Sequence, residues 1–170
     1  GDPIAEYKPA RDDVDEWHTD DSFEPEPRVA IALYAPDIDD ALPTEGGETA
    51  FASCIHAWAS MFDDEERAKL IGLKLVHSWE VFMRHLERRN PQRPKISTAD
   101  AFQHPDKIWP LVRRHPHTGE SSLYVNPKAA RRIVTSDGGA SMPEDDGRSL
   151  VVNLTTKVIQ SGVYRHPWRL

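Results

Sequence analysis

Residues 15–23 contain the most chemically specific motif of this chain, Asp15-Glu16-Trp17-His18-Thr19-Asp20-Asp21-Ser22-Phe23. His18 and Asp20 are two residues apart, and side chains at that spacing point to the same face of an extended strand. An imidazole nitrogen and a carboxylate oxygen on one face can bind the same metal ion. A His-x-Asp tripeptide also occurs by chance in polar loops near strand ends, so the rest of the sequence must decide between these two interpretations.

Four further motifs follow this one along the chain: Leu42-Pro43-Thr44-Glu45-Gly46-Gly47-Glu48-Thr49-Ala50-Phe51, His115-Pro116-His117-Thr118-Gly119, Leu123-Tyr124-Val125-Asn126 and Val163-Tyr164-Arg165-His166-Pro167-Trp168-Arg169. Each motif is weak alone, but the set in this order is hard to obtain by accident. Together with Trp17-His18-Thr19-Asp20, it resembles the TauD/TfdA family of Fe(II)/2-oxoglutarate dioxygenases, which includes taurine dioxygenase and the chlorophenoxyacetate dioxygenases. The resemblance extends over nearly the whole chain.

The resemblance implies a metal site and assigns residues to it. Two His and one carboxylate form the facial triad that holds non-haem Fe(II) and leaves positions open for substrate and oxygen. His18 and Asp20 match the first two ligands of the family, and Thr49 matches the hydroxyl that hydrogen-bonds the carboxylate of 2-oxoglutarate. The implied reaction consumes 2-oxoglutarate and O2, hydroxylates a small organic substrate that we expect to be acidic, and releases succinate and CO2.

The resemblance also indicates what this chain lacks. In the family, the third metal ligand and the arginine that binds 2-oxoglutarate follow the Tyr-Arg-His-x-Trp-Arg stretch, which places both after Leu170. The family usually has a longer N-terminal portion as well, so we expect residues 1–170 to be one partial domain taken from the interior of a longer one. Without a third ligand, Fe(II) would be held weakly. His166 is an alternative closing ligand, although the motif alignment places it before the expected His.

Two other classes of protein remain open at this point. A truncated or degenerate domain of the same fold could lack catalytic activity and act only with a partner or not at all. The extent of the chain favours that alternative, whereas the presence of His18, Asp20 and Thr49 together opposes it. A metal-dependent hydrolase could use the same ligands, but the Gly46-Gly47-Glu48-Thr49 segment would then have no clear role.

The composition is typical of one globular domain. The chain has 170 residues, of which 38% are hydrophobic, which is enough for a single core. Its formal charge of −7, from 28 acidic and 21 basic residues, gives no support for binding nucleic acid or anionic membranes. No apolar run approaches the roughly 20 residues that span a bilayer. The arginine-rich stretches 84–93 and 113–114 could steer an anionic substrate, but a solvated face is the simpler interpretation.

The single cysteine, Cys54, cannot form an internal disulfide. This favours a reducing, cytoplasmic compartment. Because Cys54 lies in the apolar run 50–55, we expect a buried small residue there and not a nucleophile. The sequence selects neither a particular substrate nor an oligomeric state.

Hydrophobic patterning predicts short strands around a helical middle. Strands are expected at 28–35, 48–52, 73–79, 109–114 and 121–125, with the first buried and the last two forming a hairpin. Helices are expected at 53–60, 63–70, 80–90 and 143–160. The last of these should bury Leu150, Val151, Leu154 and Val158, and residues 91–95 should form a loop or lid. The resemblance implies a mainly β fold with α: a double-stranded β-helix (jelly roll) core with inserted and flanking helical segments, incomplete at both ends.

Overall fold

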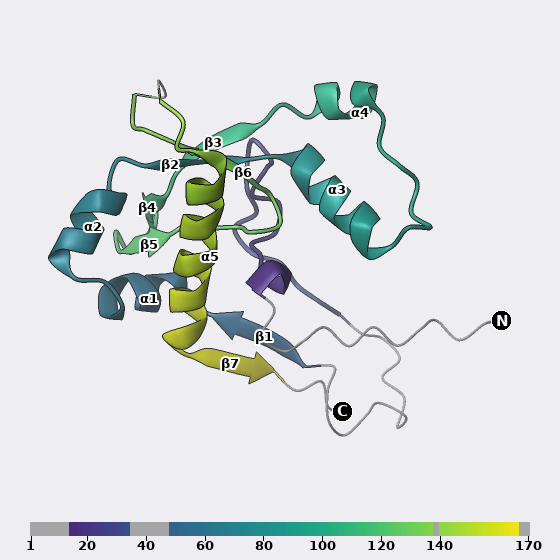
Figure 1. The fold of residues 1–170 in the computed structure, drawn as a ribbon. Helices are drawn as coiled ribbons and strands as arrows, with labels where there is room; N and C mark the ends of the chain where they lie inside the picture. The colour runs from purple at the N-terminus through teal and green to yellow at the C-terminus, as the bar shows by residue number, and fades with distance from the viewer. Residues whose placement is uncertain (1–13, 35–47, 138–139, 167–170) are drawn as a thin grey trace.

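A computed structural model describes residues 14–34, 48–137 and 140–166. In these ranges the strands form three small sheets, and neighbouring strands are antiparallel in every one of them. Helices surround the sheets, and the long C-terminal helix crosses the middle of the molecule (Figure 1). The described part is therefore a mixed α/β arrangement of antiparallel sheets and helices. The predicted jelly roll remains a prediction.

The central sheet has the strand order β3-β2-β6. β2 (Lys74–His77) lies between β3 (Lys107–Pro110) and β6 (Ala130–Val134), and its last three residues are fully buried. Consecutive buried residues indicate that both faces of this central strand are covered. The β2–β6 register shifts between Val76 and His77, because β6 has one extra residue, Arg131, and so forms a bulge opposite the buried end of β2.

The other two sheets have two strands each. β1 (Thr49–Ala52) pairs with β7 (Val163–His166), which joins the first and the last strand of the described residues. β4 (Val112–Arg114) and β5 (Ser121–Leu123) form a hairpin. Two of the sequence motifs lie in these sheets: Thr49 begins β1, and the His-Pro-His-Thr-Gly motif lies in the turn of the hairpin.

Most of the helices begin at a residue whose side-chain oxygen caps the first turn. The elements are η1 (Val14–Glu16, a 3-10 turn), α1 (Cys54–Ser60), α2 (Asp64–Leu70), α3 (Trp79–Arg89), α4 (Thr98–Gln103) and α5 (Glu144–Gln160). Ser53, Asp63, Ser78 and Ser97 each accept a backbone N–H in the first turn of α1 to α4. α2 and α4 have complete capping boxes. α5 begins after Pro143 with three acidic residues, which favour a helix N-terminus electrostatically.

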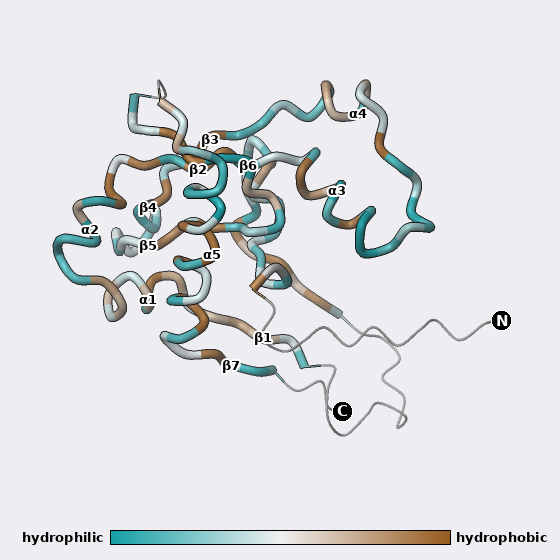
Figure 2. The backbone as a smooth tube through the Cα atoms, in the orientation of Figure 1, coloured by the Kyte–Doolittle hydropathy of each residue, from teal (hydrophilic) through white to brown (hydrophobic). Residues whose placement is uncertain are grey.

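The hydrophobic core lies between α5, α1 and the central sheet. Val151, Leu154 and Val158 of α5 are buried in one cluster with Leu75 of β2 and Ile133 of β6. Figure 2 shows hydrophobic residues in β2, whereas the end of α3 and the chain directly after it are hydrophilic. Within the described ranges, no helix is long and apolar enough to cross a membrane.

Most predicted elements are confirmed. The helices match α1, α2, α3 and α5, the strand at 48–52 matches β1, and the strand at 73–79 matches β2. The hairpin also forms, but Trp109 and Pro110 belong to β3 of the central sheet instead. Residues 91–95 form a loop, as predicted. α4 and β6 were not predicted.

The predicted buried strand at 28–35 is wrong for residues 28–34, and Ala35 lies outside the described residues. Val29, Leu33 and Tyr34 are 95%, 63% and 86% exposed. An apolar run becomes a buried strand only when other segments pair with it and cover it. In the part of the chain that the structure describes, no strand pairs with residues 28–34.

Candidate metal site

His18 and Asp20 lie side by side in an irregular segment that leads into a turn. The Nε2 atom of His18 is 3.2 Å from the Oδ1 atom of Asp20. Two ligand atoms about 2.1 Å from one ion and at right angles to each other would be about 3 Å apart, so this spacing suits a shared metal ion. The side chains are 39% and 51% exposed, which leaves them accessible from solvent. The two side chains share a face as their spacing indicated, although this segment is not a strand.

The environment of His18 favours a neutral imidazole with a free Nε2. Its Nδ1 atom is 2.9 Å from the Glu16 carbonyl oxygen, which can only accept, so Nδ1 bears the proton. Burial, followed by the positive charge of Lys128, lowers the pKa of His18, while Asp20 acts in the opposite direction. In this form, the lone pair of Nε2 faces the carboxylate oxygen of Asp20. A divalent cation would satisfy both atoms, so the pair fits a metal ion.

Charged partners fix the segment just before this pair. The Glu16 carboxylate bonds to Lys128, with the two atoms 3.2 Å apart, and also pairs with Arg89 at the end of α3. Glu16 therefore connects η1 to two other parts of the fold, and its carbonyl orients the His18 ring.

The turn after Asp20 contains a backbone conformation that non-glycine residues seldom adopt. Asp21 has φ of 53°, in the left-handed region, which aspartate tolerates better than most residues. Its carbonyl accepts the N–H of Glu24, and its carboxylate accepts a hydrogen bond of 2.8 Å from Arg28. The next residue, Ser22, is fully buried.

Ser22 is the centre of a buried hydrogen-bond network. Its Oγ atom accepts from the side-chain amide of Asn126 at 2.7 Å and lies 2.9 Å from Nδ1 of His77. Its carbonyl accepts from the indole N–H of Trp109 at 2.9 Å, and Asn126 also donates to the carbonyl of Thr19 at 2.8 Å. Burial, together with the nearby charge of Arg113, lowers the pKa of His77 to about 4.

None of these network residues was predicted to have a role in the site. Ser22 and Asn126 were inside quoted motifs, which was the available signal. His77 and Trp109 had none beyond their positions on predicted strands. Their connection to the His-x-Asp motif depends on tertiary structure, since residues 22 and 77 are 55 positions apart.

The structure does not unite all of the predicted site residues. Thr49 begins β1 directly opposite His166 of β7. Among the described residues, no group of three or more His, Cys, Asp or Glu side chains is placed to hold one metal ion, so His166 does not complete the His18–Asp20 pair. Gly46 and Gly47 of the motif before Thr49 lie outside the described residues.

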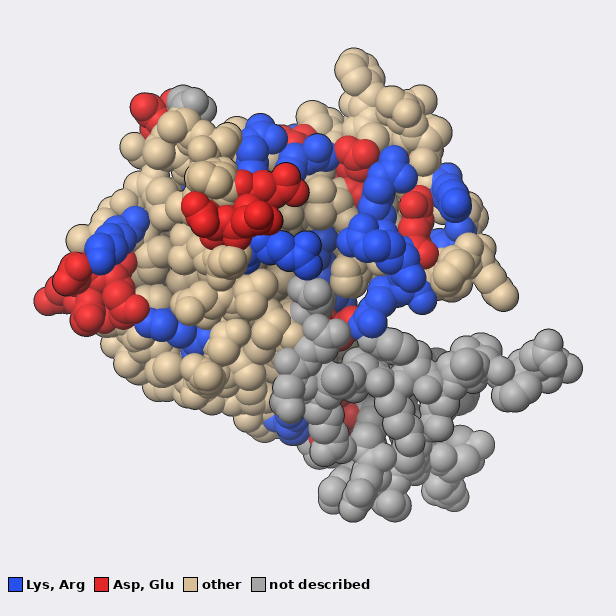
Figure 3. Space-filling model, in the orientation of Figure 1, with Lys and Arg blue, Asp and Glu red and all other residues tan. Residues whose placement is uncertain are grey.

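Other chemically interesting groups have structural explanations. Burial raises the pKa of the Cys54 thiol to about 11, which keeps it protonated and unreactive, as expected. In the arginine-rich stretches, Arg84 pairs with Glu80 and Glu87, and Arg113 packs over Trp109 and Tyr124. Figure 3 shows the basic side chains over α3 interspersed with acidic ones.

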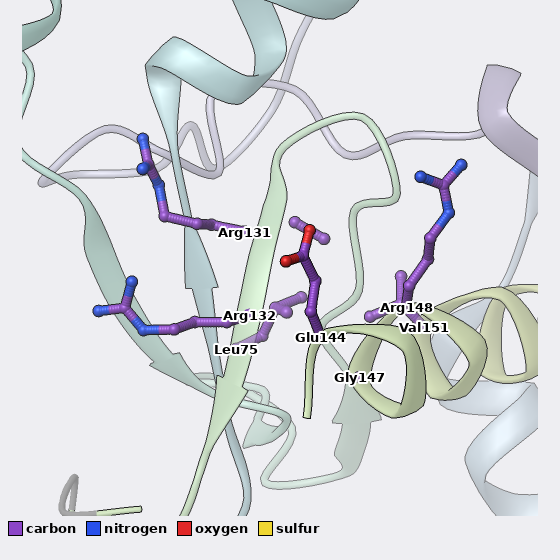
Figure 4. A pocket seen from close by; sticks show the side chains of 8 residues that line it. Leu75, Arg131, Arg132, Glu144, Gly147, Arg148 and Val151 are labelled. Atoms are coloured by element: carbon purple, nitrogen blue, oxygen red, sulfur yellow. The ribbon is translucent and has the colours of Figure 1, made fainter. Parts of the chain in front are cut away.

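A small hollow between β6 and the start of α5 is a poor anion site. Arg131, Arg132 and Arg148 contribute to its lining. Their guanidinium groups point away from the hollow, and the carboxylate of Glu144 lies beside it (Figure 4). Arg131 is also engaged with Glu80 and Asp106. This hollow is therefore a packing gap at the end of α5.

Comparison with known proteins identifies the family. The profile of the taurine catabolism dioxygenase TauD, TfdA family matches residues 2–169, nearly the whole chain. The chain belongs to this family. The TauD/TfdA resemblance inferred from the motifs is thus confirmed.

Individual relatives agree with this TauD/TfdA assignment. Pentalenolactone F synthase from Streptomyces arenae is 28% identical over 90% of this chain and 50% of its own length. The alpha-ketoglutarate-dependent 2,4-dichlorophenoxyacetate dioxygenase from Burkholderia sp. (strain RASC) is 26% identical over 91% of this chain and 46% of its own length. The crystal structure of AAD-2 in complex with Mn(II) and N-oxalylglycine superposes with a TM-score of 0.67 at 28% identity, covering 92% of this chain and 56% of that one. The chain spans about half the length of these proteins.

Proposed function

We propose that this chain is the part of an Fe(II)/2-oxoglutarate-dependent dioxygenase that provides the first two metal ligands. The enzyme would hydroxylate a small, acidic organic substrate and release succinate and CO2. The observation that supports this most directly is the 3.2 Å separation of His18 Nε2 and Asp20 Oδ1, at the ligand positions of a TauD/TfdA chain. Relatives named for alpha-ketoglutarate dependence support the choice of cosubstrate.

Each proposed role follows from the chemistry of the side chain. Neutral His18 would offer its Nε2 lone pair to Fe(II), Asp20 would offer a carboxylate oxygen, and Thr49 would donate a hydrogen bond to a carboxylate of 2-oxoglutarate. When bound, the iron would supply the oxidising chemistry that couples cosubstrate decarboxylation with O2 to substrate hydroxylation. We place the third ligand and the cosubstrate arginine in the part of the domain that these residues do not cover.

The fold and the cellular setting are part of the same proposal. The antiparallel β1–β7 pair and the β4–β5 hairpin would belong to a jelly-roll core that the rest of the domain completes. A cytoplasmic setting is supported by the single cysteine, whose thiol remains free.

An anaerobic titration with Fe(II) and 2-oxoglutarate tests this function. A chelated complex should give a weak visible metal-to-ligand charge-transfer band. We expect the band in the wild-type chain at high concentrations of both additions, because two protein ligands hold iron weakly. His18→Ala and Asp20→Ala should abolish it, and Thr49→Ala should raise the 2-oxoglutarate concentration that it requires.

His56→Ala is the matched control, because His56 is an exposed histidine on α1. This variant should retain the wild-type band. An equal band in the wild type and in both ligand variants would contradict the proposed site, and so would loss of the band in the control.

A further inference from the structure

We propose that Ser22, Asn126 and Trp109 are positioning residues that hold the His18-Thr19-Asp20 backbone in the geometry needed to bind metal. This inference rests on the proposed function, since it concerns the same pair of ligands. It adds residues from β3 and from the loop after β5 to a site that would otherwise consist of one exposed segment.

The Asn126 amide clamps both sides of Asp20. One amide nitrogen, Nδ2, has two hydrogens, and both have acceptors: the Thr19 carbonyl at 2.8 Å and the Ser22 hydroxyl at 2.7 Å. The Thr19 carbonyl belongs to the peptide bond that joins Thr19 to Asp20, so fixing it fixes the plane from which Asp20 departs. Asn126 is 1% exposed, and its bonds therefore meet little competition from water.

Ser22 transmits the rigidity of the central sheet to this turn. Its carbonyl accepts from Trp109 of β3, and its hydroxyl lies 2.9 Å from Nδ1 of His77, the last residue of β2. Both strands are in the sheet next to the hydrophobic core. A binding site is held more precisely by such elements than by a loop alone.

The backbone between the proposed metal ligand Asp20 and the buried Ser22 shows why this turn needs to be held in place. Asp21 lies between Asp20 and Ser22 with φ of 53°. Such a conformation persists when the surrounding structure fixes both sides of it. The hydrogen-bond network fixes the chain after Asp21 through Ser22 and the chain before it through the Thr19 carbonyl.

A purely structural role would stabilise the fold without affecting metal binding, and the test must separate the two. Ser22→Ala removes one hydroxyl oxygen, and Trp109→Phe removes the indole donor while retaining an aromatic ring. Ser149→Ala on the exposed face of α5 and Trp79→Phe on α3 are the matched controls. If Ser22→Ala does not fold, Trp109→Phe alone decides the test.

Two measurements are made on each folded variant of the full chain. Mn(II) is titrated, and the EPR signal of the free ion gives the affinity. Hydrogen exchange is followed without metal for backbone amides of residues 17–24 and, for comparison, of residues 151–158 in α5. Loss of a group that supports a metal ligand typically lowers affinity 10–100-fold, and we expect about tenfold here.

The expected result is weaker Mn(II) binding and faster exchange at residues 17–24 in Ser22→Ala and Trp109→Phe, with unchanged exchange at 151–158 and wild-type behaviour in both controls. Unchanged Mn(II) affinity in both network variants would overturn the positioning role while leaving the proposed function intact. Unchanged exchange at 17–24 would also overturn it. Failure of the wild-type chain to bind Mn(II) would instead overturn the proposed function and, with it, this inference.

Discussion

Two neighbouring segments, residues 17–23 and residues 28–34, are fixed to the fold to very different extents. The first is polar and irregular, yet Ser22 is fully buried and Thr19 is held by Asn126. The second reads Arg28-Val29-Ala30-Ile31-Ala32-Leu33-Tyr34, and its side chains are exposed. A segment is therefore anchored by the partners that the fold provides for it, and its hydrophobicity alone does not decide this.

The same contrast applies to the sheets. Leu75 of β2 is completely buried between helices and neighbouring strands, whereas Phe51 of β1 and Tyr164 of β7 stack on each other and remain 52% and 63% exposed. The anchored side of the molecule thus contains the central sheet and the His-x-Asp turn. The β1–β7 side contains Thr49.

The largest expected effect is on the free energy of unfolding, when a leucine of the central sheet is replaced and compared with a leucine of residues 28–34. Leu75→Ala should lower the free energy of unfolding by about 2–5 kcal/mol, because it leaves a cavity in the packed core. Leu33→Ala, at an exposed position, should change it by no more than about 0.5 kcal/mol. Urea denaturation measures both. A large loss from Leu33→Ala would show that residues 28–34 are covered after all and would remove the contrast.

A smaller effect on stability tests the hydrogen-bond network around Ser22. Asn126→Ala should lower the free energy of unfolding by about 1–3 kcal/mol, because it removes the side-chain donor to the Thr19 carbonyl and one of the two hydrogen-bond partners of the buried Ser22 hydroxyl. Asn153→Ala, at an exposed position on α5, is the control and should stay within about 0.5 kcal/mol of the wild type. Equal losses in the two variants would mean that the network adds nothing to the anchoring of the turn.

The most gradual expected effect is a dependence of stability on pH. The pKa of His77 is lowered from 6.5 to about 4, so between these values the unfolded chain binds a proton that the folded chain does not. Stability should be complete above about pH 6.5 and fall towards pH 4, by at most about 1.4 kcal/mol per pH unit from this group.

Unfolding curves for the wild type and His77→Gln at several pH values measure that dependence. The difference between the two proteins isolates His77, because His18, whose pKa is also lowered, is present in both. The wild-type curve should be the steeper one over this range. Parallel curves would indicate that His77 does not remain neutral in the fold.

The sequence predicted the parts of the fold that depend on local signals. α1, α2 and α3 begin at capping Ser or Asp residues, and α5 has an apolar face at helical spacing that is visible in the sequence. The Ser97 to Asp100 capping box was an available but unused signal for α4. β6 was missed because Arg131 and Arg132 interrupt its apolar pattern, although Ile133 and Val134 are buried.

In the candidate site, too, the local part could be predicted from the sequence and the long-range part could not. The spacing of His18 and Asp20 predicted that they could meet, and the structure places them together. The support of Ser22 by His77 and Asn126 joins residues 55 and 104 positions apart, which no local pattern can indicate. The expectation for residues 28–35 failed for the converse reason, since burial of an apolar run depends on distant segments that the pattern does not contain.

The central claim is that His18 and Asp20 bind one metal ion together, and a double-mutant comparison of Mn(II) affinity tests it most directly. Isothermal titration with Mn(II) would compare the wild type, His18→Ala, Asp20→Ala and the double variant. If both side chains hold the same ion, each single substitution should remove most of the binding, and the double variant should be little worse than either. Wild-type affinity in both single variants, or two independent losses that multiply in the double variant, would contradict the claim.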